Sequence, residues 1–108
     1  MLGGDPAPTA ERLMRSRYTA FVVGDVRHLV ASWHPGTRPD DLTLDPVLRW
    51  TGLEIVQARD GGPDDARGTV EFRATWRRGS ERGELHERSR FVRRSGGWWY
   101  VDGLVITS

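Results

Sequence analysis

The sequence predicts an α+β domain in which N-terminal helices pack on a curved antiparallel β-sheet. Apolar residues recur at helical spacing as far as residue 33, whereas strand-like alternation prevails after residue 46. Short glycine-containing turns separate the later segments, which is typical of strands joined as hairpins. Because a chain of 108 residues is the size of one domain, we expect a single domain over residues 9–108, behind a flexible leader over residues 1–8.

The first helix is predicted over residues 10–23. Thr9 is expected to cap its start, and Gly24 is expected to follow its end, because glycine adopts a positive φ without a Cβ clash. One apolar stripe runs along it at helical spacing: Ala10, Leu13, Met14, Tyr18, Phe21 and Val22.

A second, shorter helix is predicted over residues 26–33. Asp25 can cap it, and Pro35 ends it, since the residue before a proline avoids the helical region. Its buried face is expected to consist of Val26, Leu29, Val30 and Trp33.

Four strands are predicted next, over residues 47–59, 69–78, 84–94 and 98–107. Gly52 predicts a bulge or bend in the first of them. The second alternates most clearly, with an inward face of Val70, Phe72, Ala74 and Trp76. The last is apolar on both faces, so it should be central or meet a partner: Trp98, Tyr100, Leu104 and Ile106 form one face, and Trp99, Val101 and Val105 the other.

The composition excludes several classes of function. The chain has no cysteine, which rules out disulfides, thiolate nucleophiles and Cys-based zinc sites within this sequence. All 16 basic residues are arginine, but the net charge of +1 is too small for a nucleic-acid footprint. The three histidines lack metal-ligand spacing, so we expect no metal and no cofactor. With neither a signal peptide nor a membrane-spanning stretch, a cytoplasmic location and no membrane partner are the default expectations.

Long stretches of the chain resemble the central domain of the YchJ-like family. They are PTAERLMRSRYTAFVVGDVRHLVASWHPGTRP over residues 8–39, GLEIV (52–56), GGPDDARGTVEF (61–72), LHERSRFVR (85–93) and GGWWYVDG (96–103). The resemblance implies a cone-shaped, nuclear-transport-factor-two-like (NTF2-like) fold, with helices folded over a strongly curved antiparallel sheet. Many members of the family also carry cysteine-rich SEC-C zinc motifs; this sequence departs from that pattern, so a zinc-dependent role does not transfer. The wider superfamily includes enzymes, adaptors and multimerising domains, so the fold alone does not define the chemistry.

The predicted third strand is unusually rich in ionisable residues. Leu85 and Phe91 have the same parity as Glu87 and Ser89, so all four should face inward. An inward carboxylate must be paired, hydrogen-bonded or protonated, so Glu87 has either a structural partner or a functional role. A bulge would exchange the faces, and Arg88 would then point into the cone, where it could clamp an anion.

Other candidate pocket groups come from the remaining elements. Tyr18 lies on the helical stripe that faces the cavity in the cone-shaped fold, although core packing with one hydrogen bond is the simpler explanation. Asp102 shares the parity of Trp98 and Tyr100 on the last strand, so it is a second candidate carboxylate, with arginine pairing as the alternative. The full set of pocket candidates is Tyr18, Trp33, Trp50, Trp76, Glu87, Arg88, Ser89, Tyr100 and Asp102.

Three functional hypotheses follow. The first is a partly polar pocket that binds a small ligand or a peptide segment without catalysis. The second is a homodimerising interaction module, whose sheet-face interface would consist of Trp99, Val101 and Val105, with Arg73 and Arg77 at its rim. The third is an enzyme of the isomerase or hydro-lyase kind, with Glu87 or Asp102 as base and Tyr18 as proton donor. We expect a homodimer in either of the first two cases.

Overall fold

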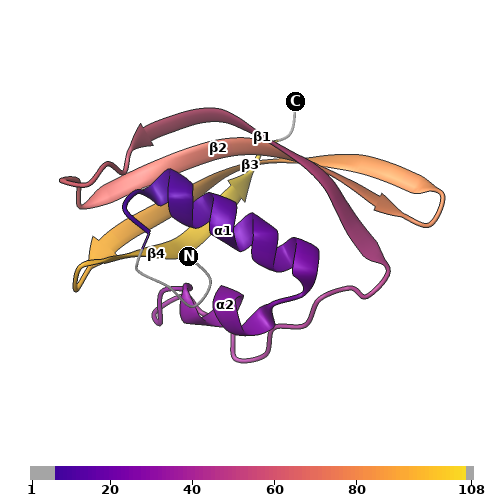
Figure 1. The fold of residues 1–108 in the computed structure, drawn as a ribbon, viewed down its shortest axis with the longest axis horizontal. Helices are drawn as coiled ribbons and strands as arrows, with labels where there is room; N and C mark the ends of the chain where they lie inside the picture. The colour runs from indigo at the N-terminus through magenta and orange to yellow at the C-terminus, as the bar shows by residue number, and fades with distance from the viewer. Residues whose placement is uncertain (1–6, 107–108) are drawn as a thin grey trace.

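The computed structural model describes residues 7–106 and has two helices followed by four strands. Its elements are α1 (Ala10–Val23), α2 (Val26–Ala31), β1 (Leu48–Asp60), β2 (Arg67–Arg78), β3 (Glu81–Arg94) and β4 (Gly97–Val105). The strands form one sheet in the order β1-β2-β3-β4, with every neighbouring pair antiparallel (Figure 1). The predicted α+β fold class is confirmed.

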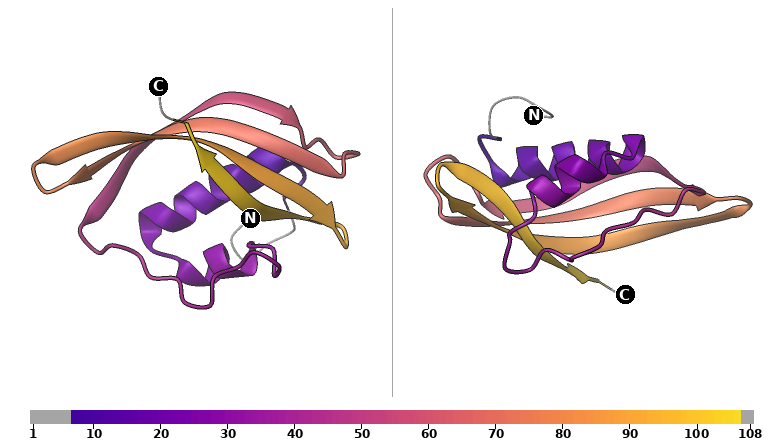
Figure 2. Two further views of the ribbon diagram at one scale, coloured as in Figure 1. Left: turned by 180° about the vertical axis from the view of Figure 1, so that it is seen from behind. Right: turned by 90° about the horizontal axis from the view of Figure 1, so that it is seen from below.

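The helices cover only one side of the sheet. Figure 2 shows the strands curving around α1, with α2 beside it on the same concave face. No helix or strand of residues 7–106 covers the opposite, outer face. Neither helix in this part of the chain is long and apolar enough to cross a membrane.

Helix α1 has the predicted bounds, because local caps define both of its ends. The Thr9 hydroxyl oxygen accepts a hydrogen bond from the Arg12 backbone N–H at 3.1 Å. Gly24 adopts the left-handed conformation at φ 76°, and its N–H bonds back to the carbonyl of Ala20.

Helix α2 ends at Ala31, two residues earlier than the predicted Trp33. The chain there leaves the helix to form a short bridge with β4. Tyr100 N–H donates to the Ser32 carbonyl at 2.9 Å, and His34 N–H donates to the Tyr100 carbonyl at 2.7 Å. These sheet-type hydrogen bonds replace the last helical turn and cover part of the free edge of β4.

Register shifts in the sheet change which side chains face the helices. One lies between Trp50 and Gly52, which confirms the bulge predicted at Gly52. Another lies in β4, where Tyr100 pairs with Phe91 but Asp102 pairs with Arg90, so the intervening Val101 has no partner.

This β4 bulge corrects the predicted faces of the last strand. Before it, Trp98 and Tyr100 face the core as expected. After it the parity reverses: Asp102 and Leu104 lie on the outer face, and Val105 lies on the inner side opposite Glu87. Trp99 and Val105 therefore do not share a face.

The core lies between α1 and the middle of the sheet. It consists of Ala10, Leu13, Met14, Val70, Phe72, Ala74, Phe91 and Trp98. A close approach holds the start of α1 against the β1–β2 loop: Ala10 N–H donates to the Gly61 carbonyl at 2.9 Å. A β-carbon on Gly68 would lie 2.5 Å from the Gly61 Cα, so only glycine fits this contact.

The predicted leader lies mostly outside the described residues, as does the predicted end of the last strand at residue 107. Residues 1–6 and 107–108 are not described. Within the described part of the leader, Pro8 accepts a hydrogen bond from the Trp98 indole at 3.3 Å.

Candidate functional site

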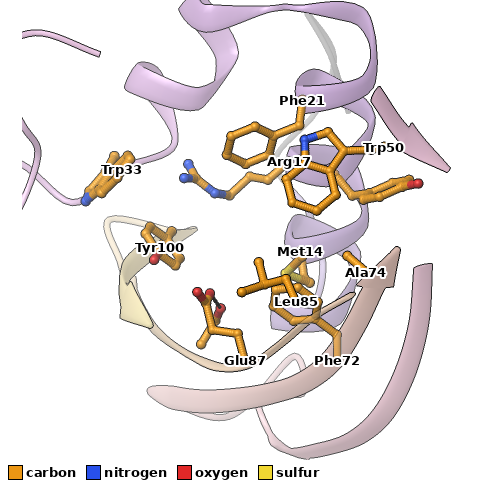
Figure 3. Close-up of a pocket in the computed structure, with 12 residues that line it drawn as sticks. Met14, Arg17, Phe21, Trp33, Trp50, Phe72, Ala74, Leu85, Glu87 and Tyr100 are labelled. Carbon is orange, nitrogen blue, oxygen red and sulfur yellow. Dashed lines mark hydrogen bonds between the residues drawn. The ribbon is translucent and has the colours of Figure 1, made fainter. Parts of the chain in front are cut away.

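A cavity of about 130 Å³ lies between α1 and the concave face of the sheet (Figure 3). Helix α1, the residues after α2 and all four strands contribute to its wall: Met14, Arg17, Tyr18, Phe21, Trp33, Trp50, Phe72, Ala74, Leu85, Glu87, Ser89 and Tyr100. Tyr18, Trp50 and Glu87 keep partial exposure, so the cavity is not sealed from solvent. Its volume is close to the roughly 150 Å³ of an engineered apolar cavity that accepts benzene.

The buried cation in this wall is Arg17, which is only 3% exposed. Its Nη1 donates to the Leu29 carbonyl at 2.8 Å and to the Ser32 hydroxyl at 2.7 Å. The guanidinium carbon lies 4.2 Å from the centre of the Tyr100 ring and 5.0 Å from that of Trp33. Arg17 thus links α1 to the end of α2 and to β4.

The sequence interpretation omitted Arg17 from the pocket candidates. A signal was present, because Arg17 follows Leu13 by four residues and precedes Phe21 by four, which places it within the apolar stripe. A charged residue at such a position must be paired or lie beside a polar cavity.

Burial makes the charge of Arg17 costly. Loss of hydration lowers the pKa of its guanidinium from 12.5 to about 10, while the nearby Tyr100 and Glu87 only partly oppose that shift. Burial also raises the pKa of Tyr100 to about 12, and Glu87 adds to the rise, so its hydroxyl is neutral at physiological pH. Burial likewise raises the pKa of Tyr18, against a smaller opposite effect of the Gly52 backbone.

Glu87 and Ser89 face inward, as the parity with Leu85 and Phe91 predicts. Ser89 is 1% exposed, and its hydroxyl donates to the Glu87 Oε2 at 2.9 Å. Gly103 lies beside them on β4, and a β-carbon there would lie 2.3 Å from the same Oε2. The missing side chain of Gly103 therefore provides the space that the Glu87 carboxylate occupies.

Aromatic rings build most of the remaining wall. Phe21 and Trp50 meet edge to face with their centroids 6.2 Å apart, and Trp33 and Tyr100 do so at 5.0 Å. The Trp33 indole N–H is buried and has no hydrogen-bond partner among residues 7–106. The cavity is therefore mainly apolar and aromatic, with its charges concentrated on Arg17 and Glu87.

Six of the nine predicted pocket residues line the cavity: Tyr18, Trp33, Trp50, Glu87, Ser89 and Tyr100. Trp76 does not; its ring lies over Gly83, where a β-carbon would come within 2.3 Å of it. Asp102 is on the outer face because of the β4 bulge, and it forms a two-pronged ion pair with Arg90. That pairing lowers the Asp102 pKa, and it removes Asp102 as a second carboxylate of the cavity.

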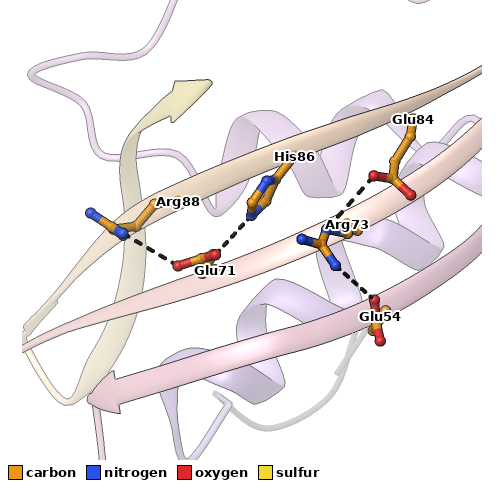
Figure 4. Close-up of polar contacts among 6 residues, drawn as sticks. All are labelled: Glu54, Glu71, Arg73, Glu84, His86 and Arg88. Atoms are coloured by element: carbon orange, nitrogen blue, oxygen red, sulfur yellow. Dashed lines mark hydrogen bonds and ion pairs between the residues drawn. The ribbon is translucent and has the colours of Figure 1, made fainter. Parts of the chain in front are cut away.

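Arg88 also lies outside the cavity, because β3 has no bulge that would bring it inward. On the outer face, Glu71 accepts from Arg88 at 3.3 Å and contacts His86 Nε2 at 2.7 Å (Figure 4). The hydrogen bond with His86 is the main cause of the lowered pKa of Glu71. The alternative in which Arg88 clamps an anion inside the cone is therefore wrong.

The predicted interface residues occupy different surroundings. Arg73 lies on the outer face between Glu54 at 3.9 Å and Glu84 at 3.7 Å (Figure 4), and Arg77 is exposed. Trp99 is on the outer face, where its indole donates to the Arg94 carbonyl at 3.3 Å.

The other two interface candidates lie at and beyond the β4 bulge. The Val101 carbonyl accepts from Thr37 at 2.6 Å, and Val105 is 55% exposed on the inner side. Trp99, Val101 and Val105 therefore do not form one continuous apolar surface.

Comparison with known families agrees with the fold. The family described as YchJ, middle NTF2-like domain, matches residues 9–103. A UPF0225 protein of Streptomyces coelicolor is 58% identical over 104 residues, covering 96% of this chain and 81% of that protein. A UPF0225 protein of Chromobacterium violaceum is 50% identical over 109 residues, with the same coverage of both chains.

Two solved structures are also similar. A SEC-C motif containing protein from Rhodopseudomonas palustris superimposes with a TM-score of 0.82 and 32% sequence identity, over 95% of this chain and 83% of that one. A SEC-C motif containing protein from Psychrobacter arcticus gives a TM-score of 0.75 and 29% identity, over 97% of this chain and 65% of that one.

Proposed function

The chain belongs to the family of YchJ middle NTF2-like domains, and we propose that this domain binds a small molecule in the cavity between α1 and the concave face of its sheet. One observation carries the proposal: the cavity contains a buried arginine and an inward glutamate within mainly aromatic walls. Small-molecule sites typically combine apolar walls with a few polar groups that orient the ligand.

The size of the cavity favours one of the two ligand classes predicted from the sequence. Sites for drug-sized ligands usually measure about 300–1,000 Å³, whereas this cavity measures about 130 Å³. It has room for a one-ring molecule or for one side chain of a peptide, but not for a peptide segment. A small molecule therefore fits better than a peptide.

Native mass spectrometry of gently purified protein tests the proposal. Wild type should carry a reproducible noncovalent adduct that is lost or strongly reduced in Glu87→Gln. Glu54→Gln is the matched control, because Glu54 is an exposed glutamate on the outer face. An adduct held equally by Glu87→Gln would contradict the proposal, since its binding site would then lie elsewhere.

The outer face of the sheet supports a second proposal, that two copies of the chain pair through it. Exposed charges of both signs alternate there, with Arg73 between Glu54 and Glu84. Such a surface is complementary to a rotated copy of itself. Partly exposed Trp99 and 64% exposed Leu104 add apolar area to the same face.

Size-exclusion chromatography with light scattering tests this pairing. Wild type and Trp99→Phe should be dimers, whereas Trp99→Glu should release monomers, because it would bury a carboxylate in the interface. A monomeric wild type, or an unchanged dimer of Trp99→Glu, would refute pairing through this face.

A further inference from the structure

We propose that the cavity takes a planar, one-ring ligand, neutral or zwitterionic, that offers a hydrogen-bond acceptor to Arg17 and a donor to Glu87. This inference rests on the proposed function and specifies the chemistry of its ligand. Three features of the cavity support it: unused hydrogen-bonding groups on each charge, the balance of the two charges, and the shape of the walls.

Arg17 uses only part of its hydrogen-bonding capacity. Its Nη1 makes both hydrogen bonds of the guanidinium, to Leu29 and Ser32. Among residues 7–106, its Nε and Nη2 donate no hydrogen bond, although Arg17 is only 3% exposed and lines the cavity. A guanidinium has five N–H donors, so three remain for a ligand or solvent.

Glu87, on the opposite wall of the cavity, also has hydrogen-bonding capacity that the protein does not use. Its Oε2 accepts from Ser89, whereas no side chain or backbone group of residues 7–106 donates to its Oε1. None of the ion pairs in this part of the chain joins Glu87 to Arg17. Figure 3 shows both side chains reaching into the same space from α1 and β3. Two opposite charges thus share a largely apolar cavity without contacting each other.

The two opposite charges in the cavity wall favour a ligand without a net charge. A simple anion would gain from Arg17 but be repelled by Glu87, and a simple cation would meet the reverse. The remaining titratable groups of the wall, Tyr18 and Tyr100, are neutral hydroxyls. A ligand that carries an acceptor and a donor side by side satisfies both charges and leaves neither buried without a partner.

The walls favour a flat ring. Rings of Phe21, Trp50, Trp33 and Tyr100 line the cavity, and their faces and edges can stack on a planar ligand. The volume of about 130 Å³ limits that ligand to a single ring. A ring with an amide-type edge therefore matches both the shape and the polar groups.

Four one-ring probes that differ only in their polar group test the inference. Benzamide offers an acceptor and a donor, benzoate an acceptor only, benzamidine donors only, and toluene neither. Each is titrated into ¹⁵N-labelled wild type, Arg17→Met, Glu87→Gln and the control Glu54→Gln, and the indole N–H signals of Trp33 and Trp50 are followed by NMR. Benzamide should bind wild type about tenfold or more tightly than each of the other three, as hydrogen bonds to charged groups predict. In Arg17→Met and in Glu87→Gln its advantage over toluene should shrink, because each variant removes or changes one of its two partners, whereas Glu54→Gln should keep it.

The outcomes separate this inference from the proposed function. If toluene binds wild type as tightly as benzamide, the cavity is a ligand site but the donor–acceptor chemistry is wrong. If benzoate or benzamidine binds best, the site prefers a simple ion and the inference is overturned. If no probe shifts the signals of the cavity, the proposed function itself fails. Toluene binding to Arg17→Met shows that this variant keeps a folded cavity.

Discussion

Replacing Arg17 by methionine should leave the domain as stable as wild type, or stabilise it by about 1 kcal/mol, while removing its polar ligand binding. A buried arginine with two hydrogen bonds would ordinarily be expected to stabilise a fold. Here the free-energy cost of burying its charge offsets the stabilisation from those hydrogen bonds. The pKa of Arg17 is lowered from 12.5 to about 10, and each pKa unit corresponds to about 1.4 kcal/mol, so the charged form is disfavoured by roughly 3 kcal/mol.

The favourable contributions of Arg17 are about as large as that cost. Its two hydrogen bonds contribute about 1 kcal/mol each. After the substitution the Ser32 hydroxyl keeps a hydrogen bond, because its one proton can donate to the His28 carbonyl at 2.7 Å or to the Leu29 carbonyl at 3.3 Å. Contact of the cation with two rings is worth about 1 kcal/mol, and the methionine sulfur recovers a similar amount against the same rings.

Urea denaturation gives the free energy of unfolding of wild type, Arg17→Met, Arg17→Ala and Arg12→Met. Arg12 is exposed on the same helix, so its substitution should change the value by less than about 0.5 kcal/mol. Arg17→Ala should cost about 2–4 kcal/mol, because it removes the packing against Trp33 and Tyr100 along with the charge. A loss of more than about 2 kcal/mol in Arg17→Met would refute the reasoning, since Arg17 would then be mainly a structural tie.

Gly68→Ala should lower the free energy of unfolding by about 1–3 kcal/mol, because its β-carbon would lie 2.5 Å from the Gly61 Cα. Gly97→Ala is the control, since the nearest atom to its β-carbon is 4.0 Å away. Equal urea denaturation curves for the two variants would contradict the close contact at Gly68. Burial raises the pKa of Tyr18 and of Tyr100 above 10.0. Ultraviolet titration of the folded protein should therefore show fewer than half of the tyrosine hydroxyls ionised at pH 10, and unfolding in urea should restore the ordinary tyrosine pKa. Because the unfolded chain then loses its tyrosine protons first, the tyrosines lower the free energy of unfolding as the pH rises above about 10. Arg17, whose pKa is about 10 in the folded protein against an ordinary 12.5, raises it over the same range, so the tyrosinate titration is the test, and a normal tyrosine midpoint in the folded protein would refute the shift. Asp102→Asn should leave any native adduct unchanged and lower the free energy of unfolding by less than about 1 kcal/mol, because the carboxylate pairs with Arg90 on the outer face. Loss of the adduct in this variant would mean that Asp102 takes part in ligand binding after all.

Several features of this protein follow from short-range patterns that the sequence alone contains. Thr9 and Gly24 define the ends of α1 through bonds to residues within one helical turn. The alternation of β2 and the parity of Glu87 with Leu85 place these side chains on the inner face, because a strand has a two-residue period wherever it is regular. The sequence therefore sufficed for the fold class and for most of the aromatic wall.

Other features depend on partners far away in the chain. Helix α2 ends early because the backbone of residues 32–34 bonds to Tyr100 on β4. The bulge at Val101 moves Asp102 out of the cavity, and its carbonyl is held by Thr37, 64 residues earlier. Gly52 lies directly at the bulge in β1, whereas the glycine nearest the bulge in β4 is Gly103, two residues beyond it.

By itself, the sequence determined the order of helices and strands and the caps of α1, and it favoured an inward Glu87 while leaving open a bulge that would turn Glu87 outward. The tertiary structure alone decided that Glu87 shares a cavity with Arg17 and not with Asp102 or Arg88. Periodicity and capping are set by neighbours within a few residues, so they can be recognised along the chain. The burial of an arginine and the position of a bulge depend on the pairing and packing of segments that are distant in sequence, so they appear only when the chain has folded.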